Sequence, residues 1–308
     1  MMVRRAALAL ITTWLLCPAA ELKRPRILGI AHMALYVSDL SKARAFYKDW
    51  LGFEEPFALK GADGADRIAF IKINDVQYLE LFAEPPKGDG QLNHISFYTE
   101  DVRALRDYLA AGGVKTPPGV SKGRTGNLSF TVADPDGHSI EFVEYQPDSW
   151  TARAKGKFMP PSRISTHMSH FGVLIGALKP AMDFYAGLLG FQETWRGGSG
   201  RFLSWVNMRV PEGEDYLEFM LYLTPPEPQQ RGVRNHICLL TPDLAQAVAQ
   251  LEARAARKQY KRPIEIRVGA NRKRLANLYD PDGTRVELME PDTIDGLPAP
   301  SSLLPPPR

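Results

Sequence analysis

The sequence repeats itself, and this repeat limits the folds open to the chain more than any other feature. Four segments of the first half return in the same order in the second half: IAHMAL at 30–35 as MSHFGV at 168–173, YLEL at 78–81 as YLEF at 216–219, LNHISFYTEDV at 92–102 as RNHICLLTPDL at 234–244, and DPDGHSIEF at 134–142 as DPDGTRVEL at 280–288. The first two segments recur at an offset of 138 positions. Two similar domains in tandem are therefore expected.

Each copy is itself double. His32 and His94 are 62 residues apart, and Glu80 and Glu141 are 61 residues apart. A quarter of the chain thus contains a strand with a histidine near its start, a helix, and further strands that end in one carrying a glutamate. Apolar residues at helical spacing over 40–51, closed by Gly52, predict the first of these helices.

Side chains alternate between the two faces of a strand. In each of these strands the histidine or glutamate therefore lies on one face, and its direct neighbours in the sequence lie on the other. The opposite face of each strand is aliphatic or aromatic and suits packing under helices. The ionisable set is His32, Glu80, His94 and Glu141 in the first half and His170, Glu218, His236 and Glu287 in the second half. A buried carboxylate is costly unless something pairs with it. Two imidazoles and two carboxylates suit a divalent cation, so at least one of the two halves is expected to bind Zn²⁺, Ni²⁺, Mn²⁺ or Fe²⁺.

The ends and the middle of the chain differ from the repeats. Residues 1–20 hold two arginines, an apolar run and small residues, which is typical of a signal peptide and predicts a secreted or periplasmic protein with no membrane span after cleavage. An uncleaved anchor or a miscalled start codon is the alternative, and the latter would make the protein cytoplasmic. Residues 27–146 and 168–291 are the expected domains, joined by a linker at 147–167 and followed by a proline-rich tail at 292–308.

Charge and cysteine content exclude some classes of function. Without residues 1–20 the chain has 36 basic and 35 acidic residues, which gives no basis for nucleic-acid binding. Only Cys238 then remains, so an internal disulfide and a cysteine-based metal site are both excluded. A small molecule is the expected partner, and the protein is expected to be a monomer or a homodimer.

The repeated motifs resemble the vicinal oxygen chelate superfamily, which includes glyoxalase I, extradiol dioxygenases and the bleomycin resistance proteins. The segments HMALYVSDLSKARAFYKDWLGF, NHISFYTEDV and DPDGHSIEF carry the resemblance, together with their second-half counterparts. It implies an α+β fold of tandem βαβββ units, four in total, that form two cupped mixed sheets with helices on the convex faces. It also implies that the eight histidines and glutamates named above are the metal ligands.

The resemblance points most closely to metal-dependent glyoxalase I, and so to an isomerase or lyase that acts on a small oxygen-chelating substrate through a metal-stabilised enediolate. Glu141 or Glu287 is then expected to act as the general base. A secreted enzyme would rarely meet the cytosolic thiol adduct of glyoxalase I, which argues against that exact reaction. The alternatives are a protein that binds or sequesters a small molecule, and a ring-cleaving dioxygenase with His170, His236 and Glu287 as its ligands.

Overall fold

The computed structural model describes residues 23–85, 90–224, 226–227, 231 and 234–307, so the segment predicted to be a signal peptide lies outside the described residues. The first half contains β1 (Ile27–Tyr36), α1 (Leu40–Arg44), the π-helical η1 (Ala45–Trp50), β2 (Glu54–Lys60), β3 (Asp66–Lys72), β4 (Tyr78–Phe82), β5 (Leu92–Thr99), α2 (Val102–Ala111), β6 (Ser121–Lys122), β7 (Leu128–Ala133) and β8 (Ser139–Glu144). The short helix α3 (Trp150–Arg153) follows in the linker.

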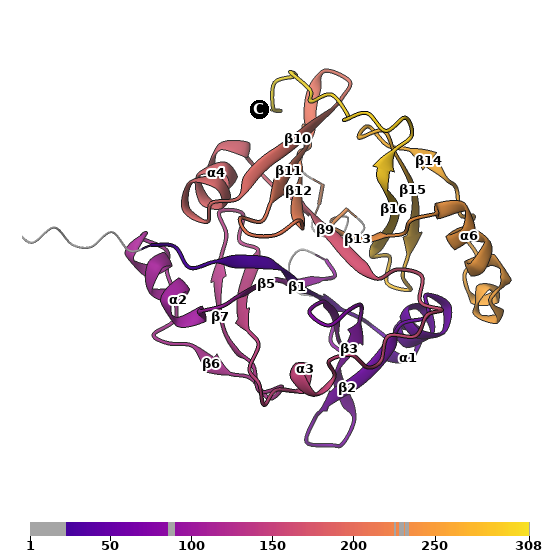
Figure 1. Cartoon of the computed structure of the whole chain (residues 1–308), viewed down its shortest axis with the longest axis horizontal. Helices are drawn as coiled ribbons and strands as arrows, with labels where there is room; N and C mark the ends of the chain where they lie inside the picture. The colour runs from indigo at the N-terminus through magenta and orange to yellow at the C-terminus, as the bar shows by residue number, and fades with distance from the viewer. Residues whose placement is uncertain (1–22, 86–89, 225, 228–230, 232–233, 308) are drawn as a thin grey trace, which may run out of the picture.

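The second half repeats this order (Figure 1). It contains β9 (His167–Leu174), α4 (Leu178–Met182), the π-helical η2 (Asp183–Leu188), β10 (Gln192–Ser199), β11 (Phe202–Arg209), β12 (Tyr216–Met220), β13 (His236–Leu240), α6 (Leu244–Ala253), the 3₁₀ segment η3 (Ala255–Gln259), β14 (Arg267–Val268), β15 (Lys273–Tyr279) and β16 (Arg285–Thr293).

Each half forms one curled eight-stranded sheet. The strand order is β2-β3-β4-β1-β5-β8-β7-β6 in the first and β10-β11-β12-β9-β13-β16-β15-β14 in the second. The pairs β1–β4 and β5–β8 are parallel, while β1 and β5 are antiparallel, so the sheet is mixed. This confirms the predicted α+β architecture of tandem βαβββ units in two cupped sheets. The four strands predicted to carry histidine or glutamate are the four central strands of each sheet.

The helices begin where the sequence provides caps. The side chains of Asp39, Asp101 and Asp243 accept hydrogen bonds from backbone N–H groups in the first turns of α1, α2 and α6. Such caps satisfy donors that would otherwise have no partner. The helix predicted over 40–51 continues from α1 into a π-helical turn, η1.

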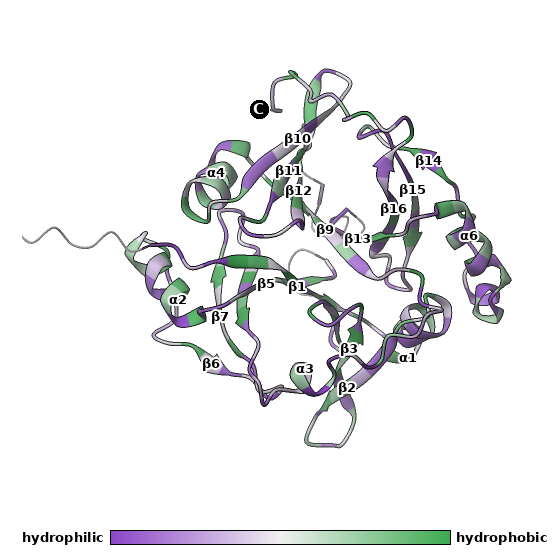
Figure 2. Ribbon diagram, viewed as in Figure 1, coloured by the Kyte–Doolittle hydropathy of each residue, from purple (hydrophilic) through white to green (hydrophobic). Residues whose placement is uncertain are grey.

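The apolar faces of the strands pack beneath these helices and form the core. Figure 2 shows hydrophobic residues along β1 and β7. Met33 and Leu35 of β1 are buried, as are Tyr47 and Trp50 of η1. The other face of β1 is therefore left to line the hollow of the sheet.

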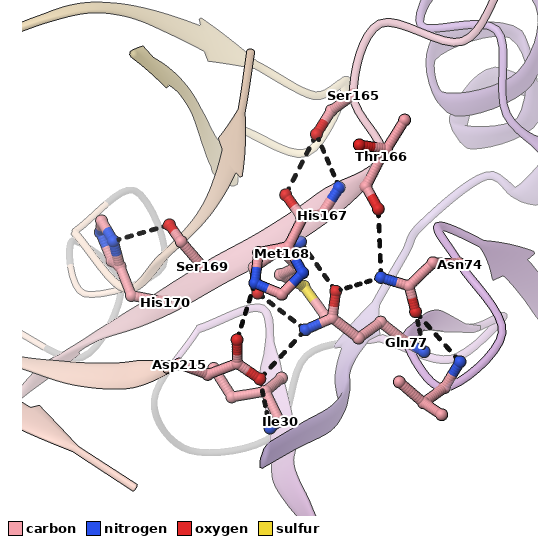
Figure 3. Close-up of polar contacts among 11 residues, drawn as sticks. Ile30, Asn74, Gln77, Ser165, Thr166, His167, Met168, Ser169, His170 and Asp215 are labelled. Carbon is pink, nitrogen blue, oxygen red and sulfur yellow. Dashed lines mark hydrogen bonds and ion pairs between the residues drawn. The ribbon is translucent and has the colours of Figure 1, made fainter. Parts of the chain in front are cut away.

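The two halves are joined by matched contacts around β1 and β9. Gln77 and Asp215 directly precede β4 and β12, at the shared offset of 138. Asp215 Oδ2 accepts a hydrogen bond from the Ile30 backbone N–H at 2.8 Å, and Gln77 bonds both the N–H and the carbonyl of Met168 (Figure 3). Gln77 Nε2 also lies 3.3 Å from Asp215 Oδ2. Each residue thus fixes, in the other half, the strand that carries the first histidine of the cup.

The DPDG turns form a second pair of joints. The Tyr47 hydroxyl donates to Asp280 Oδ2 at 3.1 Å, and the Tyr185 hydroxyl donates to Asp134 Oδ2 at 2.9 Å. His138 follows the first of these turns, yet it is only 5% exposed and its Nδ1 is 2.9 Å from Asp134 Oδ2. Helix η1 therefore packs on the second half and η2 on the first.

The segment after β16 runs back along the edge of the second sheet. The Leu203 N–H donates to the Pro305 carbonyl at 2.8 Å, and the Ser302 N–H donates to the Arg196 carbonyl at 2.9 Å. The C-terminus consequently lies beside β10 (Figure 1). Among the described residues, no helix is both long and apolar enough to cross a membrane.

Candidate metal centres

The first cup is the concave face of the first sheet, where His32 of β1, Glu80 of β4, His94 of β5 and Glu141 of β8 meet. The Nε2 atoms of His32 and His94 are 2.9 Å apart. The His32 Nε2 atom is also 3.0 Å from Glu141 Oε2 and 3.5 Å from Glu80 Oε1. The strand register brings this about, because His32 pairs with Tyr78, two residues from Glu80, and Ser96 pairs with Glu141.

The second cup is the concave face of the second sheet, where His170, Glu218, His236 and Glu287 meet in the same way. The Nε2 atoms of the two histidines are 3.1 Å apart, and His236 Nε2 is 3.5 Å from Glu218 Oε2. Ligand atoms of His170, His236 and Glu287 all lie within 4.8 Å of one another, as do those of His32, Glu80 and His94 in the first cup. The structure therefore brings all eight predicted residues into two groups of four.

The donor chemistry of both groups suits a divalent cation. Imidazole and carboxylate together are ligands for Zn²⁺, Mn²⁺, Fe²⁺ and Ni²⁺, and three donors in each cup lie close enough to one another to share one ion, with the fourth carboxylate beside them. That the residues are ligands, and which ion they take, stays a prediction.

In the first cup the two carboxyl groups differ: the charged form is disfavoured for Glu80 and favoured for Glu141. Burial raises the pKa of Glu80 to about 7 and lowers the pKa of His94 to about 4. Burial also acts against the charged forms of His32 and Glu141, but the attraction between His32 and Glu80 and the hydrogen bond between His32 and Glu141 outweigh it. The pKa of His32 is therefore raised and that of Glu141 is lowered to about 2.

In the second cup, burial lowers the pKa values of His170 and His236 well below the usual range and raises those of Glu218 and Glu287. Both cups thus hold groups that resist carrying charge in the absence of a counter-ion. A bound cation would remove this cost.

The first cup opens into a cavity of about 150 Å³. His32, Glu80 and Glu141 line its floor, and Phe57, Tyr78 and Arg124 are among the residues of its walls. The Tyr78 hydroxyl is buried and has no hydrogen-bond partner among the described residues. A substrate that enters this cavity would meet an unsatisfied hydroxyl beside the donor set.

One residue of the second cup was missed by the sequence reasoning. Arg285 lies two positions before Glu287 on β16, and a guanidinium nitrogen of Arg285 contacts His236 Nδ1. The alternation of strand faces was signal enough to place Arg285 beside the donors. The matching residue of the first half is Ser139.

The sequence profile of the Glyoxalase/Bleomycin resistance protein/Dioxygenase superfamily matches residues 29–142 and again 167–288. The chain belongs to this superfamily. The two matches together cover more than half of the chain, and each spans one of the curled sheets.

Two characterised relatives belong to the glyoxalase branch of the superfamily. The chain is 26% identical to glyoxalase I of Saccharomyces cerevisiae over 227 residues, which make up 67% of this chain and 65% of the yeast protein. The chain thus spans slightly less than two thirds of the length of that relative. It is also 29% identical to lactoylglutathione lyase of Haemophilus influenzae over 124 residues, which make up 37% of this chain and 91% of the lyase.

Solved structures with the same fold include an extradiol dioxygenase and a glyoxalase. An extradiol ring-cleaving dioxygenase from Brevibacterium fuscum superimposes with a TM-score of 0.66 at 21% identity. The superposition covers 92% of this chain and 77% of the dioxygenase chain. A Mn(II)-bound glyoxalase from Novosphingobium aromaticivorans gives a TM-score of 0.64 at 20% identity, with 86% and 83% covered. At such identities the likeness establishes the fold alone.

Proposed function

We propose that the protein is a metal-dependent enzyme of the glyoxalase type that works in its first cup. Its substrate is a small molecule with two adjacent oxygens, and the reaction is an isomerisation or lyase step through an enediolate. The observation that carries this proposal is the convergence of His32, Glu80, His94 and Glu141 on one concave face, where all of them except His94 line a cavity. When bound, a divalent ion supplies Lewis-acid stabilisation of a substrate oxygen.

The residues of the first cup have distinct roles in this proposal. His32 and His94 provide neutral imidazole donors, and the Nδ1 atom of His94 is 2.9 Å from Asn93 Oδ1, which fixes the ring and leaves Nε2 facing the cup. Glu141 is the proposed base that moves a proton at the carbon beside the substrate oxygen. Glu287 has the matching place in the second cup.

The walls of the cavity favour a small substrate with an apolar part and a polar end. Phe57 and Phe70 form an apolar wall, and the Tyr78 hydroxyl can donate to a substrate oxygen. Arg124 at the rim offers a positive charge to an anionic group.

The test is to load the protein with Mn²⁺, Ni²⁺, Zn²⁺ or Fe²⁺ in turn and to assay hemithioacetals formed from small 2-oxoaldehydes and thiols. Loss of the general base is expected to lower the rate about 100-fold or more in Glu141→Ala. The matched variant Glu287→Ala is expected to keep most of the activity. Full activity in Glu141→Ala, with the ion still bound, would remove Glu141 from the mechanism.

A second candidate is an extradiol-type dioxygenase. It is favoured by the His170, His236 and Glu287 group, which matches the two-histidine, one-carboxylate set of non-haem iron oxygenases. Oxygen uptake with catechols and Fe²⁺, lost in His236→Ala and kept in His94→Ala, would support this candidate over the first. A third candidate, a protein that binds a small molecule without turnover, would show binding in the cavity and neither activity.

A further inference from the structure

The two cups differ in what touches their second histidine. In the first cup His94 Nδ1 faces the Asn93 Oδ1 acceptor at 2.9 Å, and Ser139 occupies the position two residues before Glu141. In the second cup Arg285 occupies that position and its guanidinium contacts His236 Nδ1. The side-chain oxygen of Asn235, the counterpart of Asn93, instead accepts from the Leu174 N–H at 3.1 Å.

A guanidinium can only donate hydrogen bonds, and this decides where the proton of His236 sits. The Nδ1 atom that accepts from Arg285 carries no proton, so the proton of the neutral ring is on Nε2. That Nε2 atom faces His170 Nε2 at 3.1 Å and can donate to it. Neither Nε2 lone pair is then free for a metal ion, although the distances between the donors would suit one.

The alternative tautomer exists in the same geometry. The Nδ1 atom of His236 also lies 3.2 Å from the Arg234 carbonyl, which can accept a proton from it. In that tautomer Nε2 is free toward the cup, and Arg285 must leave Nδ1. An ion and the Arg285 guanidinium therefore compete for the same ring.

The backbone beneath His236 holds the ring in reach of Arg285. A Cβ atom on Gly172 would lie 1.8 Å from His236 Cε1, so the ring rests directly on the β9 backbone. The first sheet has Ala34 at the matching position, opposite His94. His236 is fully buried, whereas the His94 side chain is 14% exposed.

We propose that the guanidinium of Arg285 takes the place of the metal ion in the second cup, so that the protein binds one divalent ion tightly and binds it in the first cup. The permanent positive charge of Arg285 lies against His236 Nδ1, on the same strand as Glu287 and two positions before it. The inference rests on the proposed function only in that the first cup is an ion site.

The test counts ions. Protein stripped with a chelator is titrated with Zn²⁺ alone, and the bound metal is measured by elemental analysis after gel filtration and by calorimetry. The wild-type protein is expected to bind one equivalent tightly. Arg285→Gln removes the charge and frees Nδ1, and is expected to bind a second equivalent at least about tenfold more tightly than the wild-type second cup does.

Matched variants place the ions. Arg285→Lys keeps a cationic donor and is expected to stay at one equivalent. Ser139→Arg puts a guanidinium beside the first cup and is expected to weaken its ion by about tenfold. His94→Ala should lose the tight ion and His236→Ala should keep it. Circular dichroism and thermal unfolding check that each variant is folded.

Three results would overturn the inference while the proposed function stands. The wild-type protein could bind two ions equally tightly, or folded Arg285→Gln could still bind only one ion. In the third, folded Ser139→Arg would bind the ion of the first cup with unchanged affinity. Loss of the single tight ion in His236→Ala, with retention in His94→Ala, would overturn both the inference and the placement of the reaction in the first cup. A wild-type protein that binds no ion would defeat the proposed function as well.

Discussion

The two cups carry the same four donors on the same central strands, yet the residues beside those donors differ. Asn93 fixes the tautomer of His94 in the first cup, whereas Arg285 contacts the equivalent atom of His236 in the second. Ser96 in the first cup is replaced by the buried Cys238 in the second. If Arg285 takes the place of the ion as we propose, ligand types at ligand distances are not sufficient for a metal site, and the neighbours that decide where each proton lies are as important.

The largest expected effect is on ion affinity. His94→Ala should weaken Zn²⁺ binding by several hundredfold, because loss of one of four ligands removes about 3–4 kcal/mol of a binding free energy on the order of 10–16 kcal/mol. His236→Ala should change the Zn²⁺ affinity by less than about threefold. Competition with a chromophoric chelator measures both. Equal losses in the two variants would show that the cups are equivalent.

The two DPDG turns allow a second comparison, between Asp134 with His138 beside it and Asp280 with Thr284 at the matching position. Burial raises the pKa of Asp280 to about 6, against an ordinary value of 3.8. The folded state therefore binds more protons than the unfolded state between these values, and stability should fall by about 3 kcal/mol as pH rises from about 4 to 6.

Urea unfolding of wild-type and Asp280→Asn proteins across this range checks the pH effect. In Asp280→Asn the free energy of unfolding should not decline over this pH range, since an amide does not ionise. Asp134→Asn is the control and should leave the decline in place. A wild-type slope that persists unchanged in Asp280→Asn would assign the pH dependence to other groups.

A smaller effect is expected from the residue beneath the second histidine. Gly172→Ala would place a methyl group within the His236 ring, so the ring must move, and the free energy of unfolding should fall by about 2 kcal/mol. The reciprocal variant Ala34→Gly adds only backbone freedom to the first sheet and should cost about 1 kcal/mol. Thermal unfolding compares them. A neutral Gly172→Ala would mean that the ring does not rest on this backbone.

Much of the fold and of the donor set could be predicted from the sequence, because both follow from local patterns. The period-two alternation in HMALYV, YLELF, HISFY and SIEFV assigns each histidine and glutamate to one face, and the repeat multiplies that signal. The same alternation places Arg285 on the face of the donors, but it does not predict that the guanidinium contacts His236. That depends on Gly172, which is more than 100 residues away in the chain.

The contacts between the two halves also could not be predicted from the sequence. A position directly after a turn favours exposure of His138, yet the side chain contacts Asp134, which also binds Tyr185 of η2 from the other half, and it is buried. The contacts of Tyr47 with Asp280 and of Gln77 with Met168 link residues that are 233 and 91 positions apart. No local pattern reports such pairs.

The most direct test of the difference between the cups is a crystal structure of the protein with one equivalent of Zn²⁺, with anomalous scattering data recorded at the zinc edge. We expect a single strong peak between His32, Glu80, His94 and Glu141, with the Arg285 guanidinium still in contact with His236 Nδ1. A strong peak between His170, Glu218, His236 and Glu287, alone or equal to the first, would contradict it.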